Sequence, residues 1–171
     1  STPQAISALK EGTADIAVVT TPTVQAASLA ETLVKPITEV AVCSPYFTAL
    51  TGRQVSLADL AHFPLISLGK DTKSFAFFSG LFTEHGLPYQ PDIEAFTADQ
   101  ILPMVQADLG VGFVPEEFLQ DSSGVCKIDL KESIPKRHIA LIKRKEQPLS
   151  VAARELVHMI LEQSESDALV V

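Results

Sequence analysis

The stretch T-A-D-Q-I-L-P-M-V-Q-A-D-L-G-V-G-F-V-P-E, residues 97–116, decides the fold class of this chain. Its first half carries apolar residues at the spacing of one helix face, namely Ile101, Leu102, Val105 and Leu109. Gly110 follows that stripe, where a helix commonly ends in a left-handed conformation that suits glycine. The apolar run 111–114 then has the character of a buried strand, and Pro115 ends it. A helix, a glycine and a buried strand in this order predict half of an α/β sheet.

Outside that stretch, short apolar runs alternate with amphipathic helical segments. We expect strands at residues 14–20, 29–37, 39–43, 63–68, 92–96, 111–114, 125–130 and 137–142. Hydroxyl residues that can cap a helix start precede most of the expected helices, at Thr2, Ser56, Thr72 and Ser150. The alternation predicts an α/β protein with mostly parallel sheets and helices on both faces.

Composition and charge restrict the function. The formal net charge is −8 at pH 7, so the chain has no basic footprint for nucleic acid. No apolar run is long enough to span a bilayer, and no secretory signal opens the sequence, which favours a cytoplasmic protein without a membrane role. Cys43 and Cys126 lie far apart in strand-like runs and form no C-x-x-C motif. We expect them to be buried free thiols.

The sequence contains no recognisable catalytic set. Its four histidines have no metal-ligand spacing, and neither G-x-S-x-G nor H-E-x-x-H occurs. Gly110 and Gly112 precede a strand and not a helix, so they are not a phosphate-binding glycine loop. Asp15 and Asp99 are more simply explained as residues that open a strand and a helix. We therefore predict a binding domain, not an enzyme, with no metal and no cofactor.

Hydroxyl residues and strand ends indicate where a ligand binds. Helix starts expose free amides that favour an anion, and ligands of open α/β sheets bind at the carboxyl ends of strands. The expected contacts are Thr2, Thr20, Thr21, Gly69, Thr72, Thr97, Asp99, Gln100, Phe113, Val114 and Pro115. Plain helix capping is the alternative for each single threonine at a helix start. Together they suit a small anionic metabolite.

Residues 97–116 closely resemble the "lV..GlGvgfvPe" element of the effector-binding domain of LysR-type transcriptional regulators. The run A-I-S-A-L-K-E-G-T-A-D-I-A-V-V similarly resembles the family's "ai..L..G.lDlai". This resemblance implies a two-lobed, periplasmic-binding-protein-like fold with an inter-lobe cleft. Residues 1–43 and 137–171 would form lobe I, incomplete at its N-terminus, and residues 44–136 lobe II.

The resemblance also implies a function and partners. The chain would be the effector-sensing and oligomerisation domain of a bacterial regulator, and promoter DNA would be bound only through an N-terminal winged helix-turn-helix that this chain lacks. Members associate side by side, so we expect a homodimer or tetramer in which Ile6 and Leu9 meet Phe77 of a second copy. The alternative is a solute-binding protein of a transport system, which shares the architecture. An upstream secretion signal would favour that alternative, and an upstream helix-turn-helix would exclude it.

Overall fold

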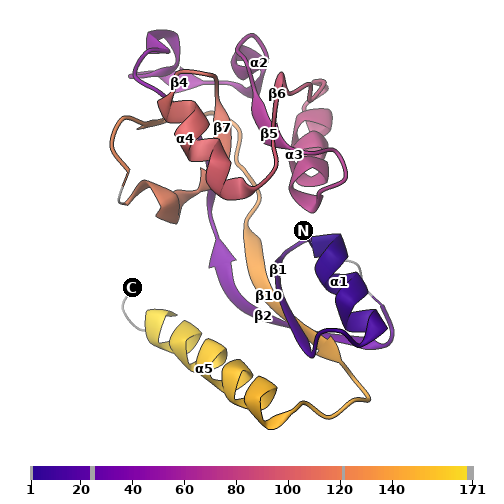
Figure 1. The fold of residues 1–171 in the computed structure, drawn as a ribbon. Coiled ribbons are helices and arrows are strands. Elements are labelled where there is room, and N and C mark those ends of the chain that lie inside the picture. The colour runs from indigo at the N-terminus through magenta and orange to yellow at the C-terminus, as the bar shows by residue number, and fades with distance from the viewer. Residues whose placement is uncertain (1, 24–25, 121, 169–171) are drawn as a thin grey trace. The chain divides into compact units, whose positions relative to one another are not determined.

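The computed structural model describes residues 2–23, 26–120 and 122–168, which fall into two compact units (Figure 1). The first unit contains the described residues of 1–37 and 137–171, and the second unit contains those of 38–136. Residues 38–43 thus belong to the second unit, whereas the sequence interpretation assigned them to the first.

A three-stranded antiparallel sheet forms the centre of the first unit. Its order is β1 (Ile16–Thr20), β10 (Arg137–Arg144), β2 (Leu29–Ile37), and β10 runs antiparallel to both neighbours. Helix α1 (Thr2–Glu11) packs on this sheet through Ile6 and Leu9. Helix α5 (Val151–Ala168) follows β10.

Arg144, at the end of β10, ties the turn between α1 and β1 to the sheet. Its Nη1 donates hydrogen bonds to the carbonyl oxygens of Leu9 and Ala14, the latter at 2.7 Å. Its Nη2 lies 3.7 Å from Asp15 Oδ1. Leu9 O lies in the last turn of α1 and also accepts the Gly12 N–H at 3.2 Å, whereas Ala14 O lies beyond the end of the helix. The arginine therefore links the end of α1 and the segment before β1 to β10.

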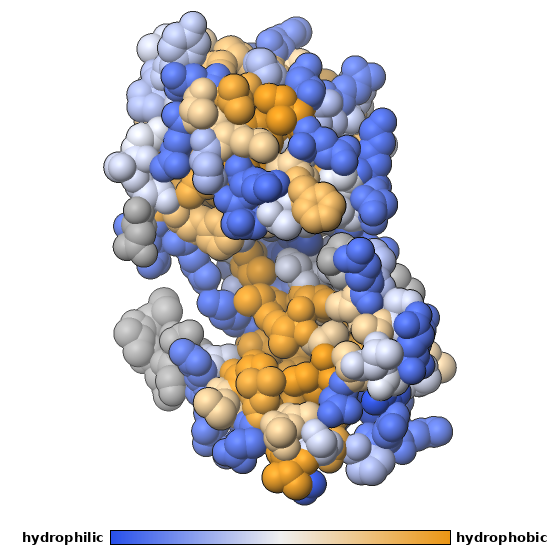
Figure 2. Space-filling view, in the orientation of Figure 1, coloured by the Kyte–Doolittle hydropathy of each residue, from blue (hydrophilic) through white to orange (hydrophobic). Residues whose placement is uncertain are grey.

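Much of the apolar surface of the first unit is exposed. Val18 and Leu33 on the sheet are 51% and 53% exposed. On α5, Ala153 is buried, but Leu156 is 48% exposed. Figure 2 shows apolar surface gathered over the strands of this unit.

The second unit is built around strands of both directions. β3 (Glu39–Cys43) pairs antiparallel with β7 (Gly112–Pro115) and β8 (Cys126–Lys127), while β5 (Ile66–Leu68) pairs in parallel with β6 (Ile93–Ala95). A short parallel pair, β4 (Gln54–Val55) and β9 (Asp129–Leu130), lies outside these strands. The remaining elements are α2 (Leu57–Leu60), α3 (Lys73–Glu84), α4 (Ile101–Gln106) and the 3-10 turns η1 (Thr48–Leu50), η2 (Ala98–Gln100) and η3 (Glu116–Leu119).

The prediction of mostly parallel sheets is wrong. A helix between two strands makes them parallel only when the strands it joins become neighbours. In the first unit β10 comes from the far end of the sequence and lies between β1 and β2, antiparallel to both. In the second unit β3 takes the central place between β7 and β8 and opposes both.

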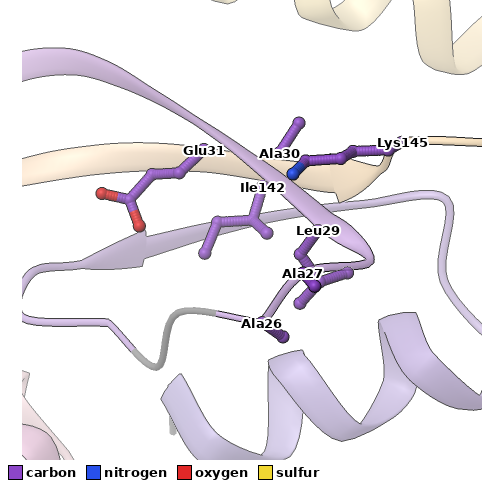
Figure 3. A pocket seen from close by; sticks show the side chains of 7 residues that line it. All are labelled: Ala26, Ala27, Leu29, Ala30, Glu31, Ile142 and Lys145. Carbon is purple, nitrogen blue, oxygen red and sulfur yellow. The ribbon is translucent and has the colours of Figure 1, made fainter.

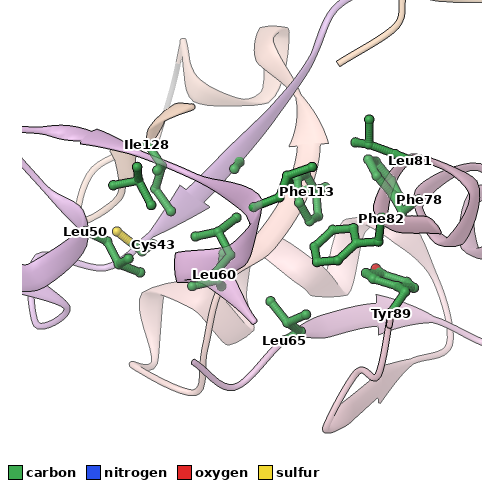
Figure 4. Packing of buried hydrophobic residues seen from close by; sticks show 14 residues of the cluster. Cys43, Leu50, Leu60, Leu65, Phe78, Leu81, Phe82, Tyr89, Phe113 and Ile128 are labelled. Atoms are coloured by element: carbon green, nitrogen blue, oxygen red, sulfur yellow. The ribbon is translucent and has the colours of Figure 1, made fainter. Parts of the chain in front are cut away.

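Two apolar cores lie on opposite faces of β3 and β7, because side chains alternate along a strand. Phe113 faces the core that α3 covers with Phe78 and Phe82 (Figure 4). Val114 faces the core that α4 covers with Ile101 and Val105. Phe78 and Phe82, four residues apart, thus lie on the buried face of α3.

Gly110 allows the backbone of Pro64 to approach closely, and Gly112 allows α4 to pack closely on β7. A Cβ on Gly110 would lie 2.4 Å from Pro64 O, and one on Gly112 would lie 2.5 Å from Ile101 Cγ2. The left-handed residue after α4 is Asp108, with φ of 61°. The expectation that Gly110 ends the helix in that conformation is therefore wrong, and its lack of a side chain serves close packing instead.

We expect Gly112→Ala to lower the free energy of unfolding by about 1–3 kcal/mol, because the added methyl group collides with α4. Gly80→Ala is the matched control, since a Cβ there meets nothing within 4 Å. Alanine should stabilise that helical position by up to about 1 kcal/mol. Urea unfolding measures both variants, and equal losses would contradict the packing argument.

Candidate functional site

Three strands of the second unit end at one edge of the sheet. β5 and β6 run parallel in a register that places Leu68 opposite Ala95. β5 also runs parallel to the segment entering β7, since Leu65 forms a parallel bridge with Val111. The carboxyl ends of β5, β6 and β7 therefore share one edge, which is where ligands bind in open α/β sheets.

The segment after β5 leads into α3 and uses its polar groups internally. Thr72 Oγ1 accepts a hydrogen bond from the Phe75 N–H at 3.1 Å and donates one to Gly69 O at 2.7 Å. Gly69 is buried, and a Cβ on it would lie 2.9 Å from Glu94 Oε1. At this point the capping alternative describes Thr72 better than a ligand contact does.

The segment after β6 is open. Thr97, Asp99 and Gln100 are all exposed and lie at the start of η2, which leads directly into α4. Gln100 Oε1 accepts hydrogen bonds from the backbone N–H groups of Phe96 at 2.9 Å and Thr97 at 3.2 Å. Two successive amides thus converge on one oxygen atom, an arrangement that also suits an oxygen of an anion.

Phe96 is a candidate contact that the sequence analysis missed. Its side chain is 92% exposed at the carboxyl end of β6, immediately before Thr97. The expected strand at residues 92–96 could have indicated it, because side chains alternate along a strand and Phe96 shares a face with the charged Glu94.

The three predicted ligand contacts at the end of β7 differ in how exposed their side chains are. Phe113 is 4% exposed and stacks on Phe78 with ring centroids 4.5 Å apart, and Val114 is 1% exposed. Their side chains pack in the two cores, and the predicted ligand contact at this strand end concerns backbone groups. Pro115 is half-buried at the end of the strand, so part of its side chain is exposed.

The other predicted contacts lie in the first unit. Thr2 is the first residue of α1, and Thr20 is the last residue of β1. Thr21 is engaged with β10, because its Oγ1 accepts the His138 N–H at 2.8 Å and its carbonyl oxygen accepts Arg137 Nε at 2.7 Å. These three belong to a different unit from the edge formed by β5, β6 and β7.

The first unit carries a separate hollow of about 740 Å³ (Figure 3). Its lining residues are Ala26, Ala27, Leu29, Ala30, Glu31, Ile142 and Lys145. Small apolar side chains dominate it, with one carboxylate and one ammonium group among them. None of the predicted contacts lines this hollow.

The residues predicted for a dimer interface are less exposed than expected. Ile6 and Leu9 are 5% and 0% exposed, because they fill the core between α1 and the sheet. Their helical stripe was correctly identified, but it faces the chain's own sheet and cannot face a second copy. Phe77 is half-buried and makes an edge-to-face contact with Phe78, with centroids 5.0 Å apart.

Among the described residues, no group of three or more His, Cys, Asp or Glu side chains could hold a metal ion. Two shifted pKa values in the second unit have structural causes. Burial raises the pKa of Tyr89 to about 12, and the amide and hydroxyl of Ser56 lower the pKa of Asp59 by hydrogen bonding. No described helix is both long and apolar enough to cross a membrane.

A protein-family model described as the LysR substrate binding domain matches residues 1–165. The chain therefore belongs to this family, the effector-binding domains of LysR-type transcription regulators, and its members are regulators and not enzymes. A comparison with curated proteins finds no match.

Solved structures share the fold. The CcmR regulatory domain of Synechocystis PCC6803, in complex with 2-PG, is similar with a TM-score of 0.82 and 14% identity over 94% of this chain and 78% of that chain. The QuiR effector-binding domain, in complex with shikimate, gives 0.81 and 16% over 97% and 79%. HinK, a LysR family regulator of Pseudomonas aeruginosa, gives 0.74 and 23% over 95% of this chain but only 58% of its own length. The chain thus has the periplasmic-binding-protein-like α/β fold of LysR effector domains.

We expect Thr72→Ala to lower the free energy of unfolding by about 1 kcal/mol, because the N-cap of α3 loses its oxygen. Thr83→Ala, on the exposed part of the same helix, is the control and should change stability by less than about 0.5 kcal/mol. Chemical denaturation of both variants measures the difference. Equal stabilities would argue against an essential cap at Thr72.

Proposed function

We propose that this chain is the sensing domain of a bacterial LysR-type transcription regulator, acting in the cytoplasm, and that it binds a small anionic metabolite. The bound metabolite favours one arrangement of the regulator over another, which changes its action on promoter DNA. DNA is bound through an N-terminal winged helix-turn-helix of the full regulator. Family membership supports this proposal, as do the small molecules bound in the CcmR and QuiR domains.

The pair of amides at Phe96 and Thr97 is the observation that carries the proposed binding position. Gln100 Oε1 accepts hydrogen bonds from both N–H groups in an exposed loop. A carboxylate or phosphate oxygen of the metabolite replaces this neutral acceptor, and hydrogen bonds to a charged oxygen are roughly twice as strong as neutral ones. The exposed ring of Phe96 then covers the apolar part of the ligand.

The charges near Gly69 direct the anion toward Thr97. The carboxylates of Glu94 and Asp71 lie close to Gly69, where they disfavour a second negative charge. The proposed contact therefore centres on residues 96–100, with Pro115 at the same edge of the sheet.

In the proposed contact the Thr97 hydroxyl donates a further hydrogen bond to the ligand. We expect Thr97→Val to weaken binding of a confirmed ligand several-fold, because losing this hydrogen bond costs about 0.5–1.5 kcal/mol. A thermal-shift screen of amino acids, keto acids, aromatic acids, sugar acids and inorganic phosphate identifies the ligand, and calorimetry gives its dissociation constant. Gln100→Ala should bind at least as tightly as the parent, since both amides become free.

Thr83→Val is the matched control for this experiment, because its hydroxyl is exposed near the other end of α3. The proposed position is wrong if Thr97→Val and Thr83→Val bind the ligand as tightly as the parent. It is equally wrong if Gln100→Ala loses binding while remaining folded.

We also propose that the chain forms a homodimer, or a tetramer, through the exposed faces of α1 and α3. The exposed positions of α1 include Gln4, Ser7 and Lys10, and Phe77 lies at the partly exposed side of α3. An isologous contact of this kind is the commonest way for identical chains to pair.

Sedimentation should show a dimer at high micromolar concentration, and Phe77→Glu should raise its dissociation constant at least about tenfold, since about 1.4 kcal/mol of contact energy corresponds to that factor. Phe118→Glu is the control, because Phe118 is 40% exposed on η3. Circular dichroism checks that both variants fold. A parent chain that stays monomeric contradicts the proposal.

A further inference from the structure

The two cysteines of the chain face each other on neighbouring strands of the second unit. Cys43 ends β3 and Cys126 begins β8, and the antiparallel register places them directly opposite one another. The adjacent hydrogen bond from the Ile128 N–H to Ala41 O, at 2.9 Å, fixes this register. Both thiols are free.

The geometry of such a pair suits a disulfide. Directly opposed residues of an antiparallel pair have Cα atoms about 4.5–5.5 Å apart. A disulfide requires Cα atoms about 4.4–6.8 Å apart. Both side chains also lie on the same face of the sheet. Cys43 is a member of the core that includes Phe113 (Figure 4), and Cys126 packs against that core.

The two thiols differ in access to solvent. Cys43 is fully buried, whereas Cys126 is partly exposed. Burial, and secondarily the neighbouring Cys126, raise the pKa of Cys43 to about 11, so Cys43 is a poor first nucleophile at neutral pH. A small oxidant therefore reaches Cys126 first, and Cys43 acts as the resolving thiol.

We propose that Cys43 and Cys126 are a redox modification site that closes into a reversible cross-strand disulfide between β3 and β8. The oxidant is a low-molecular-weight disulfide. Cys126 loses its proton to solvent and attacks one sulfur of the oxidant, whose S–S bond breaks and releases one thiol. Cys43 then loses its proton and attacks the Cys126 sulfur, which releases the second thiol. Two protein thiols are oxidised, and one small disulfide is reduced to two thiols.

This site is separate from the proposed effector position at residues 96–100. Its disulfide ties β8 to the central strand β3 and closes a loop that contains β4, β5, β6 and β7. Disulfides inside cells are usually transient and redox-sensing, which fits a pair that is reduced at rest.

The test incubates the folded chain with oxidised glutathione, denatures it in acid, alkylates the remaining thiols and measures intact mass and peptides. We expect the parent to lose both alkylatable thiols without keeping glutathione, and to yield a Cys43–Cys126 linked peptide that a reductant separates. Cys43→Ala, which removes the resolving thiol, should keep one glutathione on Cys126. Cys126→Ser should remain almost unmodified.

The same treatment in urea tests whether folding brings the two thiols together. Formation of the internal disulfide should slow at least about tenfold in urea, because unfolding lowers the effective concentration of one thiol near the other. The proposal is overturned if the folded parent keeps glutathione on Cys126 with Cys43 still alkylatable. It is also overturned if the only disulfide found links two chains. Both results are readable in the parent, so neither depends on the folding of a variant.

Discussion

Close approach of backbone to backbone at Gly110, and of helix to backbone at Gly112, is the constraint on which the second unit depends. The Val111 N–H donates to Pro64 O at 2.8 Å, and a side chain on Gly110 would occupy that space. This contact places β7 beside β5, and Ile101 packs α4 directly on Gly112. Residues 97–100 enter α4 without a loop between them, so the position of the candidate binding segment follows from the same packing.

The starts of α3 and η2 lie at the same strand edge but differ in how firmly their polar groups are engaged. At α3 the Thr72 hydroxyl is committed to two internal hydrogen bonds, which stabilises the helix and leaves it little to offer a ligand. At η2 the amides of Phe96 and Thr97 are held by an exposed glutamine side chain. An exposed partner is cheap to exchange, because both it and the released groups can hydrogen-bond to water. Binding therefore fits the segment whose internal contacts are replaceable.

Strand order has consequences that reach beyond the core. In the first unit, β10 lies between β1 and β2, and Arg144 at its end donates hydrogen bonds to the carbonyl oxygens of Leu9, in the last turn of α1, and of Ala14. In the second unit, the central place of β3 brings Cys43 opposite Cys126. Each pairing joins segments that are distant in sequence. One pairing brings an arginine donor to carbonyl oxygens near the end of α1, and the other brings two thiols together.

The sequence by itself determined the α/β class, the buried positions Ile101 and Val105 of one helix and the family element at residues 97–116, because hydrophobic periodicity and helix capping act within a few residues. Tertiary structure alone decided the strand directions, the partners against which Ile6, Leu9, Phe113 and Val114 pack, and the neighbours of Gly110, Cys43 and Arg144. An apolar stripe predicts that a helix face is buried, but it does not identify the surface that covers the face. Only the three-dimensional pairing of distant strands determines whether such a face meets the chain's own sheet, a ligand or another copy.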